Sequence, residues 1–182
     1  MRKAVFFDKD GTLVRDVPYN TDPERIALEP GAGEAVGQLR RRGFALVLVS
    51  NQSGVARGMF HEDALQAVRE RLEELLNVPF DGFYCCPHHP QGTVQPYNRD
   101  CSCRKPKPGL LLRAADDLGL ELQHCWMVGD ILHDVEAGNR AGCRTILLDN
   151  GHETEWERNA LRSPDFIADN LLEAAGWIIR ND

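Results

Sequence analysis

Short apolar runs alternate with longer amphipathic stretches along most of the chain, and this alternation restricts the fold more than any other feature. Runs of strand-forming residues lie at 3–7, 44–49, 82–85, 125–128 and 143–148, with a weaker run at 165–168. Helix-like stretches lie between or after them, at about 31–42, 61–77, 108–119, 132–141 and 169–180. This order predicts an α/β fold with an open, mostly parallel sheet and helices on both faces. The 182 residues suffice for one well-buried domain, so we expect a single domain over 1–182.

Polar residues follow four of the predicted strands at the point where each strand ends. In an open α/β sheet, ligands bind beyond the carboxyl ends of the strands, so these residues are the candidates for a site. Each group alone is also compatible with a capped turn or a plain loop. They are Asp8 and Asp10 after the first strand, Ser50 and Asn51 after the second, Lys105 in the segment after the third, and Asp130 and Asp134 after the fourth.

Asp8 and Asp10 flank Lys9 directly after a strand that is apolar enough for the core. Positions i and i+2 point to the same side, so the two carboxylates are expected to converge. Carboxylates that approach a core need a metal, a cation or hydrogen-bond donors. The pair can hold Mg²⁺, or one carboxylate can attack a substrate while the other moves a proton. Gly11, which follows the pair, permits an unusual backbone turn.

Lys105 stands shortly before a predicted helix that starts near Pro108. The amino terminus of a helix favours anions over cations, so the helix itself gives no reason for a lysine here. An anion bound between Lys105 and the helix would account for the lysine, and the amino terminus of the helix would also favour that anion. The alternative is a solvated basic turn.

The segment 85–109 fits neither a helix nor a strand, and it is rich in proline, cysteine and histidine. A long structureless loop in a compact domain is usually functional or clamped. Two close pairs of residues have the side chains that a closed tetrahedral zinc site uses, which predicts a structural rather than a catalytic metal. The predicted ligands are Cys86, His88, Cys101 and Cys103. Cys85 and His89 are rival ligands, and disulfide pairing is the alternative to a metal.

The balance of charges excludes several classes of protein. A formal net charge of -7 argues against general affinity for nucleic acid or for anionic membranes, although local basic clusters can still bind an anion. No apolar run approaches the roughly 20 residues of a membrane span. Acidic residues interrupt the opening "MRKAVFFDKD" too early for a signal peptide. We therefore expect a cytoplasmic protein with no nucleic-acid partner and no membrane partner.

The ordered strand-end residues resemble the four motifs of the haloacid dehalogenase superfamily. They are "DKDGT" at Asp8, a hydroxyl at Ser50, the lysine Lys105, and "GDILHD" from Gly129 to Asp134. The resemblance implies a Rossmann-like phosphatase. No insertion between Asp10 and Ser50 or between Ser50 and Lys105 is long enough for a large cap domain.

The same resemblance implies a role for each strand-end residue. Asp8 would be the nucleophile that forms an aspartyl-phosphate, and Asp10 would be the general acid and base. Ser50 and Lys105 would bind the transferring phosphoryl group. Mg²⁺ would be held by Asp8, the backbone carbonyl of Asp10, and Asp130, while Asp134 would support Lys105 or a metal-bound water.

Four further segments closely resemble the D-glycero-D-manno-heptose 1,7-bisphosphate phosphatases, which belong to this superfamily and act in lipopolysaccharide precursor biosynthesis. They are "FFDKDGTLV", "VSNQSGVARG", "YCCPHHPQG" and "CSCRKPKPG". This resemblance implies hydrolysis of the 7-phosphate of a sugar bisphosphate, with structural Zn²⁺ in the loop. The implied substrate contacts are Asp16, Tyr19, Ser50, Asn51, Gln52, Ser53, Arg57, Arg104 and Lys105. Arg57, Arg104, Lys105 and Lys107 suit a substrate with two anionic ends.

Several alternatives stay open at this level. Histidinol phosphate carries a cationic amine, for which Asp16 is a possible counterpart. A non-catalytic zinc-bearing interaction module, a nucleic-acid end phosphatase and a phosphotransferase or phosphomutase are the others. Ile131 stands where we expected a second basic residue, so the preference for the α or the β anomer is not determined. We expect a monomer, with Trp156 and Trp177 in the core.

Overall fold

Six strands form one parallel sheet in the order β3-β2-β1-β4-β5-β6 in this computed structural model, which describes residues 2–182. The strands are β1 (Ala4–Phe7), β2 (Ala45–Asn51), β3 (Gly82–Cys86), β4 (Trp126–Gly129), β5 (Arg144–Leu148) and β6 (Phe166–Ala168). The helices are α1 (Ala32–Arg41), α2 (Ala64–Leu76), α3 (Gly109–Leu118), α4 (Leu132–Ala141) and α5 (Leu171–Arg180). The predicted open parallel sheet is confirmed, and all six predicted strands and five predicted helices are present.

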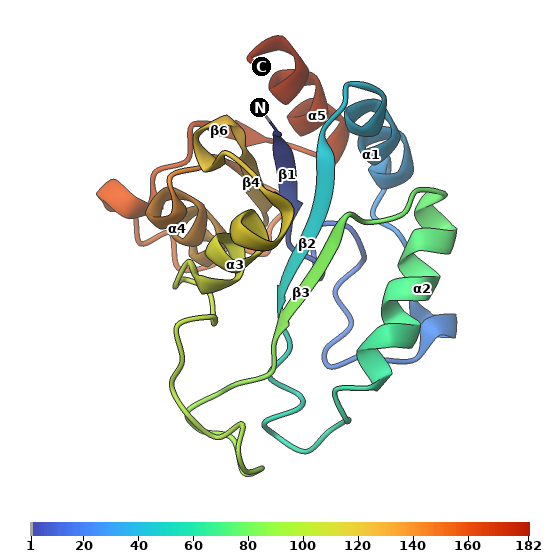
Figure 1. Cartoon of the computed structure of the whole chain (residues 1–182), viewed down its shortest axis with the longest axis vertical. Coiled ribbons are helices and arrows are strands. Elements are labelled where there is room, and N and C mark those ends of the chain that lie inside the picture. Colours follow the sequence, from blue (N-terminus) through green and yellow to red (C-terminus); the bar gives the residue numbers. More distant parts are fainter. Residues whose placement is uncertain (1) are drawn as a thin grey trace.

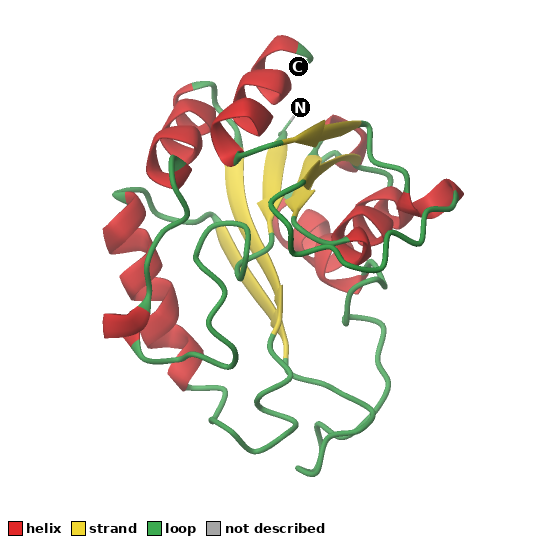
Figure 2. Ribbon diagram, turned by 180° about the vertical axis from the view of Figure 1, so that it is seen from behind, coloured by secondary structure: helices red, strands yellow, loops and turns green. Residues whose placement is uncertain are grey.

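Helices cover both faces of the sheet (Figures 1 and 2). Successive residues of a strand point to opposite faces, so Val5 and Phe7 pack with α1, α2 and α5, whereas Ala4 and Phe6 pack with α3 and α4. Strands that are apolar on both faces are typical of parallel sheets, because helices bury each side. The two resulting cores meet across β1, whose four residues are fully buried.

The strand order reverses next to β1, and this reversal places the site. Phe7 pairs with Leu48 of β2 on one side and with Val128 of β4 on the other. The backbone N–H of Asp8 still donates to the carbonyl of Val128, at 3.0 Å. Chain connections leave opposite faces at such a switch point and open a crevice beyond the strand ends. Asp8 therefore enters this crevice between β2 and β4.

The connections between strands agree with a sheet that lacks an inserted cap. Within the described residues, the connection from β1 to β2 holds a short 3₁₀ turn, Pro23–Arg25, and α1, and the connection from β2 to β3 holds α2. The segment between β3 and α3 holds neither helix nor strand, as predicted, and it extends from the lower end of the sheet in Figure 1. None of the helices among residues 2–182 has the length and apolar character to cross a membrane.

The two tryptophans of the C-terminal third differ in their surroundings. Trp177 packs against the core and stacks on Phe166, with ring centroids 4.0 Å apart. The expectation of a core position is wrong for Trp156, which is 38% exposed and has a φ of 51°. It lies in the loop between β5 and β6, where the cation of Arg158 sits 5.1 Å from its ring centroid.

Candidate active site and metal centre

The strand-end residues meet in one cavity of about 490 Å³ beyond the carboxyl ends of the strands. The end of β2, the segments that follow β1, β3, β4 and β5, and the first turn of α4 line it. Because these strands are neighbours in the sheet, residues far apart in sequence become neighbours in space. The lining residues are Asp8, Asp10, Asp16, Ser50, Asn51, Arg104, Lys105, Asp130, Ile131, His133, Gly151 and His152.

Lys105 is a buried cation between two carboxylates. Its Nζ lies 2.6 Å from Asp8 Oδ1 and 2.6 Å from Asp134 Oδ1, and it donates to the carbonyl of Val49 at 3.0 Å. Burial lowers the pKa of Lys105, but attraction to Asp134 and Asp8 outweighs burial and raises it, so the ammonium stays charged. Asn51 positions the lysine, because its side chain accepts from the N–H of Lys105 at 3.0 Å and donates to its carbonyl at 3.1 Å.

Three carboxylates gather around this lysine more closely than one cation can balance. Oxygens of Asp8, Asp130 and Asp134 lie within 4.8 Å of one another. Burial raises the pKa of Asp130 to about 8, with repulsion from Asp8 and Asp134 adding to the shift. Burial also raises the pKa of Asp134, although Lys105 opposes the change. Raised carboxyl pKa values mean that the cluster lacks positive charge. A divalent cation that prefers oxygen ligands, such as Mg²⁺, would supply this charge.

Two glycines make the close approach of these carboxylates possible. Gly11 has a φ of +76°, and a Cβ built on it would lie 2.1 Å from Asp130 Oδ2. A Cβ on Gly129 would lie 2.3 Å from the Asp134 side chain, which folds back over the strand end. Both distances are shorter than any side chain tolerates. The glycines of "DGT" and "GD" therefore leave room for the carboxylates.

Asp10 lines the same cavity within a polar network. One carboxylate oxygen is paired with the ammonium of Lys9, and the other accepts from Gln52 Nε2 at 3.3 Å. The same Gln52 nitrogen donates to Ser50 Oγ at 2.8 Å. Burial raises the pKa of Asp10 even though Lys9 acts to lower it. A raised carboxyl pKa suits a group that must both give and take a proton.

The loop after β3 brings its four predicted metal ligands together. The sulfur of Cys86 lies 3.5 Å from that of Cys101 and 3.1 Å from that of Cys103, which are 3.3 Å from each other. His88 Nδ1 lies 3.4 Å from the sulfur of Cys103. In a tetrahedral site with Zn–S bonds of about 2.3 Å, ligand atoms are about 3.5–3.8 Å apart. The cluster fits a Zn²⁺ ion in size and donor type.

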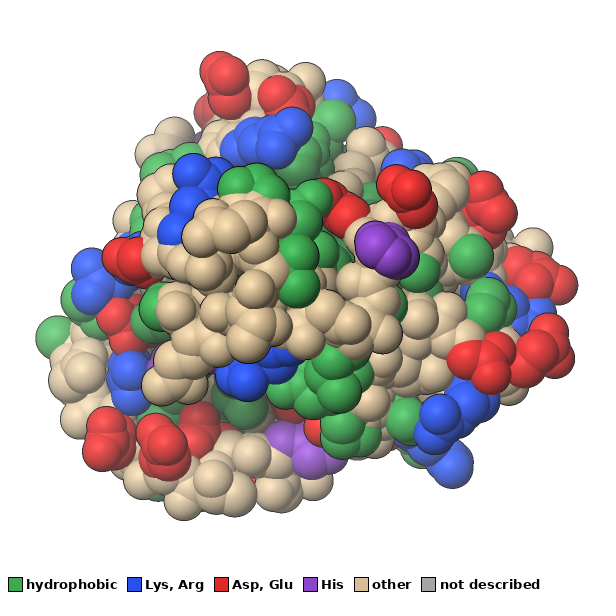
Figure 3. Space-filling model, turned by 90° about the horizontal axis from the view of Figure 1, so that it is seen from below, with side chains coloured by type: hydrophobic (Ala, Val, Ile, Leu, Met, Phe, Trp, Pro, Cys, Tyr) green, Lys and Arg blue, Asp and Glu red, His purple; other side chains and the backbone are tan. Residues whose placement is uncertain are grey.

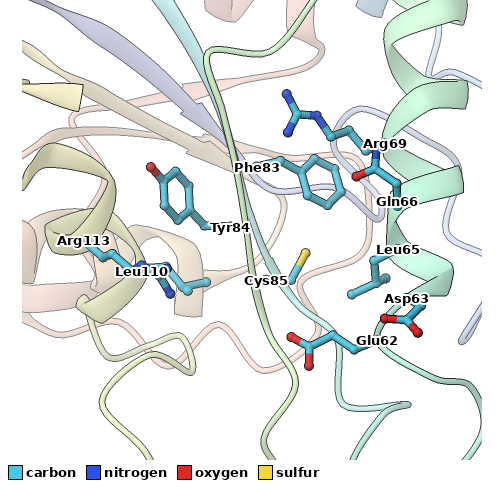
Figure 4. Close-up of a pocket in the computed structure, with 10 residues that line it drawn as sticks. All are labelled: Glu62, Asp63, Leu65, Gln66, Arg69, Phe83, Tyr84, Cys85, Leu110 and Arg113. Atoms are coloured by element: carbon cyan, nitrogen blue, oxygen red, sulfur yellow. The ribbon is translucent and has the colours of Figure 1, made fainter. Parts of the chain in front are cut away.

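The rival ligands point elsewhere. His89 Nδ1 accepts from the backbone N–H of Gln91 at 3.1 Å, and its Nε2 faces Arg57 at 3.3 Å. Cys85 lines a different cavity of about 440 Å³, which runs along the outer edge of β3 between α2 and α3 (Figure 4). Burial raises the pKa of the Cys85 thiol to about 12. Neither residue belongs to the cluster formed by Cys86 and its partners.

The residues expected to contact substrate divide into three groups. Asp16, Ser50, Asn51, Arg104 and Lys105 line the cavity described above. An adjoining cavity of about 230 Å³ shares Asp10, Asp16 and Asn51 with it and adds Tyr19, Gln52 and Ser53. Arg57 is exposed beside His89 and lines neither of these two cavities, and Lys107 pairs with Asp100 at 2.6 Å. The basic group near the aspartates is thus smaller than the sequence suggested.

Three residues in or beside the cavity did not emerge from the sequence. Lys9 is only 3% exposed and pairs with Asp10. His133 and His152 line the cavity from α4 and from the loop after β5. The segment that carries His152, "DNGHETEW", also follows a strand, so applying the strand-end rule to the fifth strand would have found it. No sequence pattern indicated that Lys9, which stands between Asp8 and Asp10 in the sequence, would be buried against Asp10.

The end of the molecule that carries the loops has no large patch of one charge. Figure 3 shows this face, where the drawn acidic, basic and histidine side chains are dispersed among neutral atoms. A groove for a nucleic-acid backbone is expected to carry a stripe of lysine and arginine. This face offers no such stripe among the residues described.

Sequence relatives match nearly the whole chain. D-glycero-beta-D-manno-heptose-1,7-bisphosphate 7-phosphatase from Escherichia coli K12 is 42% identical over 181 residues, covering 98% of this chain and 88% of that protein. The protein of the same name from Yersinia pestis is 38% identical over 174 residues, covering 93% of this chain and 92% of that protein. A family model described as HAD-hydrolase-like matches residues 102–174.

Solved structures agree with these relatives. A D,D-heptose 1,7-bisphosphate phosphatase from B. bronchiseptica, complexed with magnesium and phosphate, superposes with a TM-score of 0.85 at 28% identity, covering 100% of both chains. A HAD-like phosphatase from Mesorhizobium loti also gives a TM-score of 0.85, at 36% identity, covering 99% of this chain and 87% of that one.

Proposed function

The chain belongs to the D-glycero-β-D-manno-heptose-1,7-bisphosphate 7-phosphatase family of haloacid dehalogenase-like hydrolases, and we propose that it removes the 7-phosphate from this sugar bisphosphate. It is a phosphoric monoester hydrolase. One observation supports the proposal above the others. The carboxylates of Asp8, Asp130 and Asp134 gather within 4.8 Å of one another beside Lys105, in the cavity that Asp10 and Ser50 also line. The product would be the heptose 1-phosphate.

Asp8 is the proposed nucleophile. Its Oδ1 is held 2.6 Å from Lys105 Nζ, which fixes the orientation of the carboxylate and reduces its repulsion from the phosphate. A carboxylate oxygen of Asp8 attacks phosphorus, the bond between phosphorus and the sugar oxygen breaks, and an aspartyl-phosphate forms. Ser50 accepts from Gln52, so its own hydroxyl hydrogen is available for a phosphoryl oxygen. Lys105 would contact another of these oxygens by giving up one of its three present acceptors, which are Asp8, Asp134 and the carbonyl of Val49.

Asp10 is the proposed general acid and base. Its raised pKa lets it carry a proton to the departing sugar oxygen. The resulting carboxylate then takes a proton from the water that attacks the aspartyl-phosphate, which releases inorganic phosphate and restores Asp8. Lys9 and Gln52 each hold one oxygen of Asp10, so the carboxyl group is fixed in position through both steps.

We propose that Mg²⁺ is held by Asp8, Asp130 and the backbone carbonyl of Asp10. When bound, this ion neutralises the carboxylates and withdraws charge from the phosphoryl oxygens. Asp134 acts behind the site, because its contact with Lys105 keeps the ammonium in place. We further propose structural Zn²⁺ on Cys86, His88, Cys101 and Cys103, where a closed set of four ligands holds the loop that ends in Arg104 and Lys105.

The sugar and its second phosphate are proposed to lie along the two connected cavities. Asp16 and Asn51 border both cavities, and Tyr19, Gln52 and Ser53 line the smaller one. Arg104 supplies a guanidinium to the phosphate that is not cleaved, since it lines the larger cavity beside Lys105. Arg57 is the proposed further contact, although reaching the substrate requires its side chain to leave His89. Relatives named for the β anomer support this anomer as the substrate.

We propose that residues 1–182 act as one domain, as a monomer and in the cytoplasm. A single sheet that joins the first and last strands supports one domain. The gathering of three free cysteines with a histidine supports a reducing compartment, because such clusters bind metal there and form disulfides elsewhere.

Phosphate release from four substrates tests the proposal. The α and β anomers of D-glycero-D-manno-heptose 1,7-bisphosphate, histidinol phosphate and a 3′-phosphorylated oligonucleotide are compared with Mg²⁺ present. We expect the β bisphosphate to have the highest kcat/KM. Faster turnover of histidinol phosphate, with no activity on either bisphosphate, would overturn the substrate assignment, and activity on none of the four would overturn the function.

A further inference from the structure

His152 contacts one of the carboxylates that we assign to Mg²⁺. Its Nδ1 lies 2.8 Å from Asp130 Oδ2, and its side chain is 37% exposed at the wall of the cavity. The hydroxyl of Thr12 donates to the other oxygen, Oδ1, at 3.2 Å. Within residues 2–182, these are the side chains that contact the Asp130 carboxylate by hydrogen bonds. The carboxylate is thus held on both oxygens by groups from two different loops.

The loop that carries His152 is fixed at both sides of the histidine. Asn150 Nδ2 donates to the carbonyl of Gly11 at 2.7 Å, which ties the loop to the turn after Asp8 and Asp10. Glu153 Oε2 accepts from the backbone N–H of Leu132 at 2.6 Å, which ties the loop to the first turn of α4. The two anchors stand on either side of His152 in the sequence, at Asn150 and Glu153, and His152 contacts Asp130. The position of His152 is therefore set by its neighbours and does not depend on its own contact alone.

The residues next to Asp130 neither replace the His152 contact nor block it. Ile131, the neighbour of Asp130, has no polar group to offer the carboxylate, although it lines the same cavity. Gly11 has no Cβ, and one built there would lie 2.5 Å from His152 Nδ1 as well as against Asp130. The turn after the nucleophile therefore has to be a glycine for the imidazole to reach Asp130.

We infer that His152 is a positioning residue for the metal site, which donates its Nδ1 hydrogen to Asp130 Oδ2 and holds that carboxylate turned toward the cation. This inference rests on the proposed role of Asp130 as a Mg²⁺ ligand. A carboxylate bound to a metal through one oxygen is oriented by the hydrogen bonds to its other atoms. Without the His152 donor, the Asp130 carboxylate can rotate before the metal binds. Metal binding then has to restrict this rotation, so the affinity for the metal falls.

A competing interpretation predicts the opposite change. An imidazolium paired with Asp130 could occupy the place of the cation and weaken metal binding by repulsion. Removing the ring would then raise the affinity for the metal. The sign of the change in affinity therefore separates a positioning residue from a competitor.

Binding of Mn²⁺ in the absence of substrate tests the inference without a measurement of turnover. Mn²⁺ accepts the same oxygen ligands as Mg²⁺, and electron paramagnetic resonance measures the free ion directly. The variants are His152→Ala, which removes the donor, and His152→Asn, whose Nδ2 is as many bonds from Cβ as the Nδ1 of histidine. His133→Ala is the matched control, because His133 lines the same cavity without a hydrogen bond to Asp130. Asp130→Asn tests the metal site itself.

We expect His152→Ala to raise the Kd for Mn²⁺ by about tenfold, the lower end of the range for lost outer hydrogen bonds to metal ligands. His152→Asn should restore most of the affinity, and His133→Ala should bind like the unaltered protein. An unchanged or lower Kd in His152→Ala, with binding lost in Asp130→Asn, would overturn the inference and leave the metal assignment standing. Unchanged binding in Asp130→Asn would overturn the assignment and the inference together.

Discussion

The carboxylate site and the cysteine-rich loop both follow strands of the same sheet, but they are held in place by different means. Asp8, Ser50 and Asp130 stand within one residue of a strand end or inside a strand, so the hydrogen-bonded ladder of the sheet sets their spacing. The cluster around Cys86 and Cys101 joins residues across a segment without helix or strand. The sheet aligns the first site, whereas the second has only Cys86 in a strand and otherwise depends on its side-chain cluster and on scattered backbone hydrogen bonds, such as those from Thr93 and Val94 to the carbonyl of Ala56.

This difference predicts how each region responds to change. The carboxylate site keeps its shape when one member is replaced, because the strands do not depend on it, but it loses its chemistry. The loop loses its shape when one ligand is replaced, because no backbone ladder substitutes for the missing contact. Arg104 and Lys105 stand directly after Cys103, so the second region presents two residues to the first. Substitutions in each region test whether the two regions differ in this way.

The largest effect is expected from Asp8→Asn in the carboxylate site. An amide is a poor nucleophile, so turnover should fall by about 10⁴-fold or more. Removing one of three clustered carboxylates relieves repulsion, so the melting temperature should stay the same or rise. Phosphate release and thermal unfolding measure the two quantities. Asp149→Asn is the matched control, since Asp149 also follows a strand, β5, but is exposed and outside the cavity. Substantial turnover by Asp8→Asn would contradict the nucleophile assignment.

Cys101→Ser should have the next largest effect. It should change the conformation of the loop more than it changes the catalytic residues. Loss of one ligand of four should lower the affinity for Zn²⁺ by at least about 100-fold, beyond the loss caused by outer contacts. The loop between β3 and α3 should then become open to proteolysis while the sheet stays folded. Elemental analysis and limited proteolysis measure these changes. Cys85→Ser is the matched control, because Cys85 is next to Cys86 in the sequence but outside the cluster, and this variant should still bind Zn²⁺. One tightly bound zinc per chain in Cys101→Ser would show that the cluster is not the site.

Arg104→Ala should have an intermediate effect that connects the two regions. A charge-assisted hydrogen bond to phosphate contributes about 1.5–3 kcal/mol, so KM for the bisphosphate should rise by about 10- to 100-fold with a smaller change in kcat. KM for a sugar monophosphate that lacks the second phosphate should change little. Steady-state kinetics on both substrates measures the difference. An equal rise in KM for both would place Arg104 at the phosphate that is cleaved.

The smallest effect is expected from pH on the metal-free protein. The pKa of Asp130 rises to about 8 on folding, so between about pH 4 and pH 8 the folded state holds a proton that the unfolded state has lost. The free energy of unfolding therefore falls as pH rises through this window. Mg²⁺ replaces the proton, so it should stabilise most above pH 8, by about 3–6 °C at ten times its Kd. Thermal unfolding at several pH values measures this. A Mg²⁺ effect that is independent of pH, or equal in Asp130→Asn, would contradict it.

Local patterns predicted much of the site because most of its members are tied to strand ends. Asp8, Ser50 and Asp130 each follow or end an apolar run, and the parallel sheet places all such ends at one edge. The Cys and His residues were predictable from their spacing, since two tight pairs of metal-type ligands have few other uses. Lys9 and Gln52 were not predictable as a pair around Asp10, because their contact depends on how two strand ends lie beside each other.

Local hydrophobic periodicity is enough to predict the order of the elements, the two faces of the sheet and the edge at which charged residues collect. The packing of the folded chain sets which of those residues touch. It places Lys105 between Asp8 and Asp134, directs Arg57 and Lys107 away from the aspartates, and brings His152 to Asp130. The contacts of Lys105 with Asp8 and Asp134, and of His152 with Asp130, join residues 22 to 97 positions apart, and only the packing of the folded chain brings them within bonding distance.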